Sequence, residues 1–209
     1  GCATAPAGAP ALSKAPRALS LGERVEAAIR STAPQDGAAV VVAVAFQDLE
    51  TGESFFREER VRLHAASTMK IPVLVALYRA IDRGEMSFDR LLPIKNQFAS
   101  LVDGSAFTLL REEDGDPELY DRVGQAESVR ELARRMIVRS SNLSTNLLIE
   151  LLGARAITLA MRDLGAPDIE VLRGVEDEKA FAAGLINTTT AHDLLVILRS
   201  IAEKRAVSP

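Results

Sequence analysis

The chain has few of the residues that build metal centres, disulfide frameworks and aromatic-rich binding surfaces. In 209 residues it contains one cysteine, two histidines, two tyrosines, seven phenylalanines and no tryptophan. A single cysteine excludes an internal disulfide. The two histidines, His64 and His192, are far apart in the sequence, and no second cysteine is present, so no ligand cluster for a metal is apparent. We therefore expect no metal and no cofactor.

The sequence also lacks an excess of basic charge and a long apolar run. It has 25 Lys and Arg residues against 29 Asp and Glu residues, for a net charge of −4, and a pI of about 5.4. This balance gives no indication of a nucleic-acid partner. The longest apolar run, residues 38–46, has the length of a strand rather than of a membrane span. With 47% hydrophobic residues, the chain can bury a core in one or two domains.

Residues 1–19 are rich in Ala, Pro and Gly and are predicted to form a flexible tether before a folded domain at 20–209. Cys2 follows Gly1 at the start of this tether. The arrangement resembles the cut end of a bacterial lipoprotein, whose cysteine is lipidated. The alternative is a free thiol at a frayed chain end. The lipoprotein interpretation implies export to the periplasm or cell envelope, with membrane anchoring only through Cys2.

Hydrophobic periodicity predicts a fold of the α+β class, a mostly helical domain plus an incomplete antiparallel sheet. Residues 38–47 are β-branched-rich and are predicted to be a buried strand, which pairs with a weaker strand at 53–57. We expect no further strands downstream. The acidic segment 111–122 is predicted to be a solvated loop or lid. Helices are predicted at 20–31, 70–82, 128–138, 143–152, 154–164 and 190–204, with an irregular segment at 167–184.

The segment at 63–82, LHAASTMKIPVLVALYRAID, combines a serine, a lysine and an apolar helix. Residues three apart share one helix face, so Ser67 and Lys70 can meet. A partly desolvated lysine can remove the proton of a serine and so activate it as a nucleophile. The alternatives are a helix cap and a solvated lysine, since S-x-x-K arises by chance about once in such a chain. The residues expected to face the core are Ile71, Leu74, Val75, Tyr78 and Ile81.

Two further segments carry polar groups that suit a catalytic site. Ser140, Ser141 and Asn142 interrupt two apolar helices, where ordinary loop and cap chemistry is the alternative and, for this segment taken alone, the favoured one. Glu176 and Glu178 lie in the irregular segment, where a solvated acidic loop is the alternative.

Taken together and in this order, these segments resemble the penicillin-recognising serine enzymes, especially class A β-lactamases. LHAASTMKIPVLVALYRAI is similar to the nucleophile helix of that family. VRELARRMIVRSSNLSTNLLIELLG is similar to its S-D-N element, and EDEK with the later NTTTAHDL resembles its omega loop and the following helix. The resemblance covers residues 21–204. It implies a β-lactamase/transpeptidase-like fold, a monomer, and a small-molecule substrate, either a β-lactam or a peptidoglycan peptide.

The resemblance also implies a role for each candidate residue. Ser67 would attack the lactam carbonyl and form an acyl-enzyme, with Lys70 as base. Ser140 would relay a proton to the leaving nitrogen. Asn142 would hold Lys70 and the substrate amide. Glu176 would activate the water that removes the acyl group. His64 precedes the nucleophile, but S-x-x-K chemistry does not need it, and His192 is expected at the surface.

The sequence departs from the family at several positions. Ser141 replaces the Asp of S-D-N, Ala180 replaces an Asn after the omega-loop glutamate, and Asn187 replaces the acid of an Arg–Asp clamp. The candidate arginine, Arg173, is one residue out of register.

No Lys-Thr-Gly element occurs in the chain. We therefore expect a C-terminally truncated chain with weak or absent catalysis by residues 1–209 alone. Three hypotheses remain open: a class A β-lactamase-like hydrolase, a D-Ala-D-Ala carboxypeptidase or related penicillin-binding esterase, and an envelope binding domain without activity.

Overall fold

The computed structural model describes residues 19–32 and 40–208 and divides into two units, with the boundary after Val42. In the first unit, helix α1 (Leu21–Thr32) begins at a capping box formed by Ser20 and Glu23. The Ser20 amide donates to the Glu23 carboxylate (2.7 Å), and the Glu23 amide donates to the Ser20 hydroxyl (3.2 Å). Residues 1–18 of the predicted tether, Cys2 included, lie outside the described residues.

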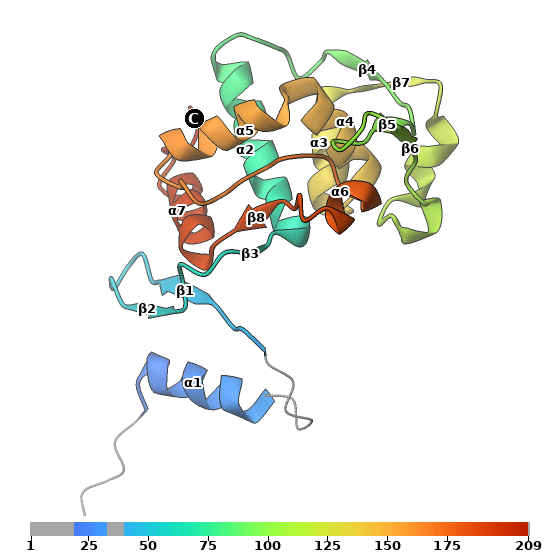
Figure 1. Ribbon diagram of the computed structural model, residues 1–209. Helices are drawn as coiled ribbons and strands as arrows, with labels where there is room; N and C mark the ends of the chain where they lie inside the picture. Colours follow the sequence, from blue (N-terminus) through green and yellow to red (C-terminus); the bar gives the residue numbers. More distant parts are fainter. Residues whose placement is uncertain (1–18, 33–39, 209) are drawn as a thin grey trace, which may run out of the picture. The chain divides into compact units, whose positions relative to one another are not determined.

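Helix α2 (Lys70–Asp82) is the central element of the second unit (Figure 1). It follows the short strand β3 (Leu63–His64) and the single 3-10 turn η1 (Ala66–Met69). The expected core face was wrong in detail. Tyr78 is 40% exposed and packs edge-on against Phe88. The deepest side chains are Val73 and Leu77, because neighbouring helices cover α2 on more than one side.

The predicted helices around α2 are confirmed to within two residues, and their caps explain where they begin and end. Ser128, Ser141 and Thr190 are N-caps whose hydroxyls accept an amide hydrogen from the residue three positions later. Gly153 ends one helix at a φ of 82°, which suits glycine. These helices are α3 (Val129–Val138), α4 (Asn142–Leu152), α5 (Ala154–Asp163) and α7 (Ala191–Ala202), with a short additional helix, α6 (Glu178–Ala182).

Two hydrophobic clusters meet at α2 and fix its position. The larger cluster joins α2 to α3 and α4 and includes Val73, Leu132 and Leu148. The smaller cluster joins α2 to α5 and α7 through Val75, Met161 and Ile197, among others. Each fully buried large aliphatic side chain contributes roughly 1.5–3 kcal/mol. The junction of η1 and α2, which carries Ser67 and Lys70, is therefore supported by both hydrophobic clusters.

The strands are shorter and more numerous than predicted. The hairpin of β1 (Val44–Gln47) and β2 (Ser54–Arg57) is confirmed, with Val44 opposite Arg57. The strand predicted at 38–47 is cut short, and Val40 and Val41 are more than half exposed, since no described strand pairs with β1 besides β2. Strands do occur downstream, contrary to expectation. They form three further antiparallel pairs: β3 with β8 (Thr188–Thr189), β4 (Leu91–Pro93) with β7 (Ala126–Ser128), and β5 (Phe98–Ala99) with β6 (Ala106–Phe107).

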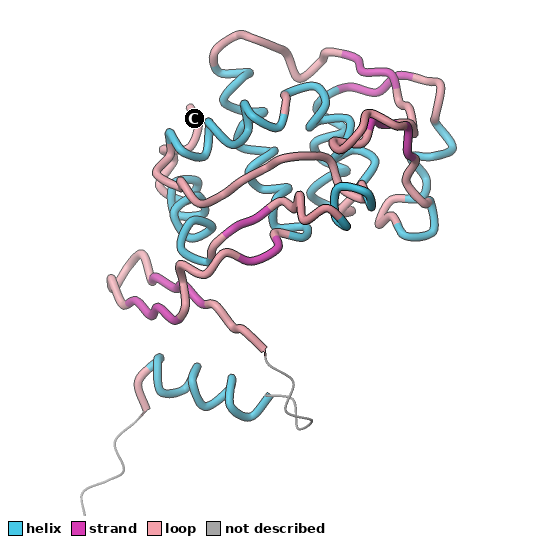
Figure 2. Tube along the Cα trace, in the orientation of Figure 1, coloured by secondary structure: helices cyan, strands magenta, loops and turns pink. Residues whose placement is uncertain are grey.

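The segment between α2 and α3 is mostly loop, as Figure 2 shows. It includes two short 3-10 stretches, η2 (Arg111–Glu113) and η3 (Pro117–Arg122). The prediction of a solvated acidic loop here was wrong in part. Asp114, Asp116 and Leu119 are buried, whereas most other residues of segment 111–122 are exposed. Sequence charge alone suggested solvent exposure, whereas here the carboxylates are buried because backbone amides and arginines satisfy them.

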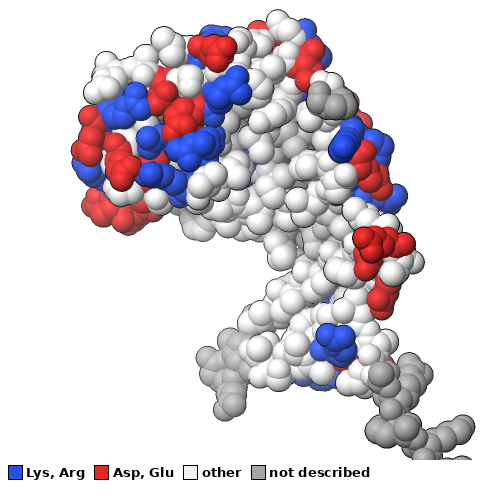
Figure 3. All heavy atoms as spheres, turned by 180° about the vertical axis from the view of Figure 1, so that it is seen from behind, with Lys and Arg blue, Asp and Glu red and all other residues white. Residues whose placement is uncertain are grey.

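The surface of the larger unit mixes charges of both signs. On the face shown in Figure 3, Lys and Arg side chains lie among Asp and Glu side chains rather than apart from them. Within residues 19–32 and 40–208, no single helix is long and apolar enough to span a membrane. Helices α4 and α5 meet that criterion only when taken together, and they are bent by 81°.

Candidate active site

Ser67, Lys70 and Ser140 form one hydrogen-bonded group, although Ser140 is far from the other two in sequence. The Lys70 ammonium lies 3.3 Å from the Ser67 hydroxyl oxygen and 2.8 Å from the Ser140 hydroxyl oxygen. The two hydroxyl oxygens are 3.4 Å apart. η1 and α2 supply the first two residues, and the turn between α3 and α4 supplies the third. A proton can therefore pass between any two of the three groups.

Three residues at the site have left-handed backbone conformations without being glycine. Their φ angles are 44° for Ala66, 57° for Ser140 and 61° for Glu176. Such conformations cost of order 1–3 kcal/mol each and persist only where the surrounding structure holds them. Here the Lys70 ammonium donates to the Ser140 carbonyl at 2.7 Å. Strain at Ala66, next to Ser67, and at Ser140 and Glu176 is typical of a functional site.

Lys70 is the group that joins the site together. It is 3% exposed and also donates to the Asn142 side-chain oxygen (2.9 Å). Burial lowers the pKa of Lys70, while the negative charges of Asp114 and Glu176 oppose that change. A lysine whose pKa lies below its usual value is neutral more often, and the neutral amine can accept the proton of Ser67.

Asn142 connects Lys70 to Glu176. Its amide nitrogen donates to the Glu176 carboxylate (2.5 Å), while its oxygen accepts from Lys70. Burial raises the pKa of Glu176, and the charges of Asp114 and Glu113 add to this, whereas the Asn142 bond opposes it. A carboxylate with a raised pKa is a stronger base than an ordinary glutamate.

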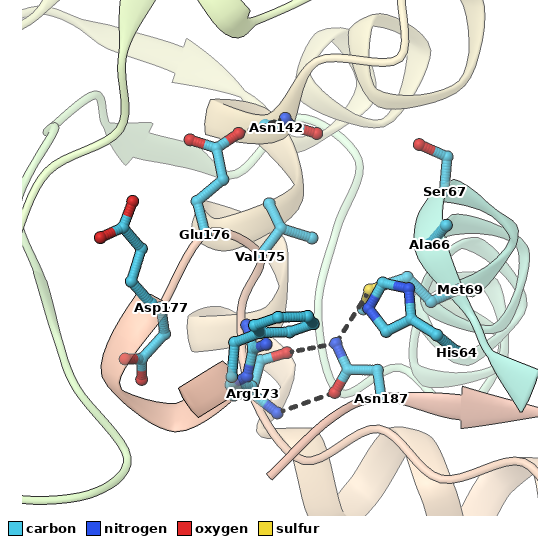
Figure 4. Close-up of a pocket in the computed structure, with 12 residues that line it drawn as sticks. His64, Ala66, Ser67, Met69, Asn142, Arg173, Val175, Glu176, Asp177 and Asn187 are labelled. Carbon is cyan, nitrogen blue, oxygen red and sulfur yellow. Dashed lines mark hydrogen bonds between the residues drawn. The ribbon is translucent and has the colours of Figure 1, made fainter. Parts of the chain in front are cut away.

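A pocket of about 310 Å³ opens between Ser67 and Glu176. Figure 4 shows the Ser67 hydroxyl on one side and the Glu176 carboxylate, beside Asn142, on the other. The rest of the wall includes Met69 and Val175. His64 also lines the pocket, with its ring edge-on to Phe181 at 6.0 Å. The Ser67 hydroxyl is hydrogen-bonded to Lys70 and Ser140, so the geometry favours the serine–lysine interpretation over a serine–histidine one.

Asn187 holds the beginning of the loop that carries Glu176. It is the residue that replaces the acid of the Arg–Asp clamp. Its side-chain oxygen accepts from the amides of Leu172 (2.8 Å) and Arg173 (3.2 Å), and its nitrogen donates to the Arg173 carbonyl (3.0 Å). Figure 4 shows the Asn187 contacts within the pocket wall. The Arg173 guanidinium instead donates to the carbonyls of Gly174 and Leu185. Hydrogen bonds between the Asn187 side-chain amide and the backbone thus take the place of the Arg–Asp ion pair.

Asn146, which the sequence analysis did not single out, fixes the backbone beside Glu176. Its nitrogen donates to the Val175 carbonyl (3.0 Å), and its oxygen accepts from the Val175 amide (2.6 Å). A Cβ atom at Gly174 would lie 2.5 Å from the Asn146 oxygen, so this close approach requires glycine. The signal available in the sequence was a polar residue inside the apolar helix α4. In the structure Asn146 is buried, at 2% exposure.

Asp177 anchors the other side of the same loop. Its carboxylate accepts from the Ser100 hydroxyl (2.9 Å) and from the Leu101 amide (2.8 Å), and it caps α6 through the Ala180 amide. Ala180 is itself fully buried and offers no side-chain amide near Glu176. Glu178 is exposed at the pocket rim.

His192, which was predicted to lie at the surface, is less exposed than expected. It is partly buried, with one ring nitrogen 3.0 Å from Asp193 and the other 3.1 Å from Arg60. It belongs to the start of α7 rather than to the pocket. Among the described residues, no group of three or more His, Cys, Asp or Glu side chains is arranged to hold a metal ion.

The α+β fold of this chain is the β-lactamase/transpeptidase fold, as solved structures show. An ancestral class A β-lactamase matches with a TM-score of 0.70 and 26% identity, over 91% of this chain and 66% of that one. A β-lactamase from Sphaerobacter thermophilus matches with a TM-score of 0.61 and 28% identity, over 79% of this chain and 57% of that one. A variant of PBP-A, solved as an acyl-enzyme complex with penicillin G, gives a TM-score of 0.62 and 27% identity, over 80% of this chain and 57% of that one.

The sequence profile of the β-lactamase enzyme family matches residues 23–209, and the chain belongs to that family. A β-lactamase from Rhodobacter capsulatus is 29% identical over 151 residues, which are 72% of this chain and 47% of the relative. The chain thus spans about half the length of that curated relative. Membership of this family supports a hydrolase.

Proposed function

We propose that this chain carries the acylation site of a class A-type serine β-lactamase, which opens β-lactams through an acyl-enzyme on Ser67. The observation that carries the proposal is the set of hydrogen bonds by which the buried Lys70 ammonium joins the Ser67 and Ser140 hydroxyls. The acyl-enzyme complex of the PBP-A variant with penicillin G supports the same chemistry on a similar fold.

In the acylation step, neutral Lys70 accepts the Ser67 proton while the Ser67 oxygen attacks the lactam carbonyl. The backbone amide of Ser67 is one donor to the oxygen that becomes negative. The lactam C–N bond then breaks, and the proton reaches the leaving nitrogen through the Ser140 hydroxyl, 2.8 Å from Lys70. The product is an ester on Ser67 and a secondary amine, and Lys70 returns to its neutral form.

In the deacylation step, Glu176 takes a proton from a water molecule, whose oxygen attacks the Ser67 ester. The ester C–O bond breaks, and the Glu176 proton returns to the Ser67 oxygen. The base must be ionised, and burial raises the pKa of Glu176. Deacylation should therefore lose rate as the pH falls through a value above the ordinary range of glutamate.

The alternative within the same family is a D-Ala-D-Ala carboxypeptidase or other penicillin-binding type of enzyme. Buried Ala180 favours it, since no side-chain amide from that position helps to hold a water near Glu176. In such an enzyme acylation proceeds and deacylation is slow. A binding domain without activity is the third hypothesis, and it predicts no reaction at Ser67.

Intact-protein mass spectrometry after mixing the full chain with penicillin G tests all three hypotheses. The β-lactamase proposal expects Glu176→Gln to accumulate one penicilloyl group while the wild type returns to its starting mass. The Ser67→Ala control should stay unmodified. Accumulation of the adduct by the wild type itself would favour the carboxypeptidase hypothesis. Failure of both the wild type and Glu176→Gln to gain the adduct would refute the acylation site.

Replacing Asn146 by alanine is expected to lengthen the lifetime of the acyl-enzyme. The change releases the Val175 backbone beside Glu176, and a misplacement of about 1 Å can cost about 10²-fold in rate. The matched control is Asn96→Ala, because Asn96 makes the same pair of bonds to the backbone of Leu109. Both variants should lose roughly 1–3 kcal/mol of stability, but only Asn146→Ala should hold the adduct longer. Equal lifetimes would contradict this role.

A further inference from the structure

The segment 114–120 packs against the turn that carries Ser140 and Asn142, and Asp114 makes the contact. One Asp114 carboxylate oxygen accepts from the Asn142 amide (3.1 Å) and the other from the Leu143 amide (2.8 Å). The remaining bonds come from the Asp116 amide and the Tyr120 hydroxyl, both at 2.9 Å. Asp114 therefore binds the first amides of α4 directly after Ser141.

The four bonds to Asp114 all come from uncharged donors. Its neighbour Asp116 is different, because it pairs with Arg135 (2.8 Å) and Arg139 (2.9 Å). No Lys or Arg in the described parts of the chain pairs directly with Asp114, which is 7% exposed. A buried anion held by neutral dipoles keeps a long-range effect on nearby charges, since no adjacent cation cancels it.

We propose that Asp114 is a positioning residue of the site: its carboxylate orients the turn that carries Ser140 and Asn142, and its charge acts on Lys70 and Glu176. The inference rests on the proposed function for its effect on acylation. It assigns a role to segment 114–120, which otherwise resembles a surface loop. The Asp114 carboxylate lies beside the turn in which Ser141 replaces the Asp of S-D-N.

The charged and titratable groups around Asp114 come from several elements. Lys70 comes from α2 and Glu176 from the loop before α6, and the Asp114 charge raises the pKa of both. Glu113 also acts on Glu176. Tyr120 donates its hydroxyl to Asp114, and its pKa is raised by burial and by that bond. Asp116 faces Arg135 and Arg139 and does not contribute to the Lys70 pKa.

The test is Asp114→Asn in the full chain, with Asp116→Asn as the matched control. Titration of Lys70 by ¹³C NMR of its Cε should show a lower pKa in Asp114→Asn than in the wild type, and an unchanged pKa in Asp116→Asn. The acid limb of acylation by penicillin G should move to lower pH in Asp114→Asn only, since neutral Lys70 is then more abundant. A Lys70 pKa in Asp114→Asn that equals the wild-type value would overturn the proposal.

Failure of this inference is distinguishable from failure of the proposed function. The NMR titration needs no catalysis, so it decides the effect of Asp114 even in a protein that penicillin G does not acylate. If Asp114→Asn alone does not fold, the double variant Asp114→Asn with Ser141→Asp can be used instead. It replaces the lost carboxylate with one inside the turn itself, at the N-cap of α4. It should regain the wild-type Lys70 pKa, and failure to regain it would overturn the proposal.

Discussion

Replacing Lys70 by methionine is expected to lower the rate at which penicillin G acylates Ser67 by about 10³-fold. Methionine has nearly the same length and is accommodated in buried sites, but it can neither accept the Ser67 proton nor donate to Ser140 and Asn142. In the wild type, four oxygens of these three residues lie within hydrogen-bonding distance of the Lys70 nitrogen, which has three N–H donors for them. No other described lysine or arginine is within hydrogen-bonding distance of the Ser67 hydroxyl.

The measurement is the rate of adduct formation by rapid-quench mass spectrometry, with folding checked by circular dichroism. Lys95→Met is the matched control, because Lys95 pairs with Glu150 at the surface and is about half exposed. That variant should react at the wild-type rate. A folded Lys70→Met variant that acylates as fast as the wild type would rule out Lys70 as the group that activates Ser67.

Replacing Gly115 by alanine is expected to lower the free energy of unfolding by about 3 kcal/mol and the melting temperature by about 10 °C. A Cβ at this position would lie 2.1 Å from the Arg139 carbonyl oxygen. Neither side can move easily, because Asp114 and Asp116 hold the segment on both sides of Gly115. Since Arg139 precedes Ser140, the displaced turn should also slow acylation.

Thermal unfolding and the acylation rate measure this effect together. Gly124→Ala is the control, because Gly124 lies in the same loop region, between η3 and β7. Gly124 has a φ of 89° with nothing within 4 Å of an added Cβ, so alanine there costs only backbone strain of about 1–2 kcal/mol. Gly124→Ala should acylate normally. Equal losses of stability and activity in both variants would show that the contact with Arg139 does not hold the turn.

The parts of the site that were predictable from sequence are those set by local geometry. Ser67 and Lys70 meet because residues three apart share a helix face. The helices predicted from 128 and from 190 likewise begin at local caps, in which the Ser128 and Thr190 hydroxyls accept from the amide three residues later. The turn of Ser140 and Asn142 was chosen by its resemblance to a family, and the structure brings both residues to Lys70.

The parts that were not predictable depend on contacts between segments far apart in the chain. Asp114 lies in an acidic stretch whose composition suggests solvent, yet it is buried against α4. Asn146 and Asn187 hold the Glu176 loop through backbone amides and carbonyls. Such partners leave no residue-type pattern, because every residue other than proline offers the same amide.

By itself, the sequence determined the helices, the serine–lysine pair and the family of this protein, since helix periodicity and short motifs are local properties. Only the tertiary structure decided which distant groups complete the site. It brought Ser140 and Asn142 to Lys70 and Glu176 to Asn142, and it placed Asp114, from an acidic stretch, against the backbone of Asn142. The physical reason is that buried polar groups must find partners, and the folded chain alone determines which partners are within reach.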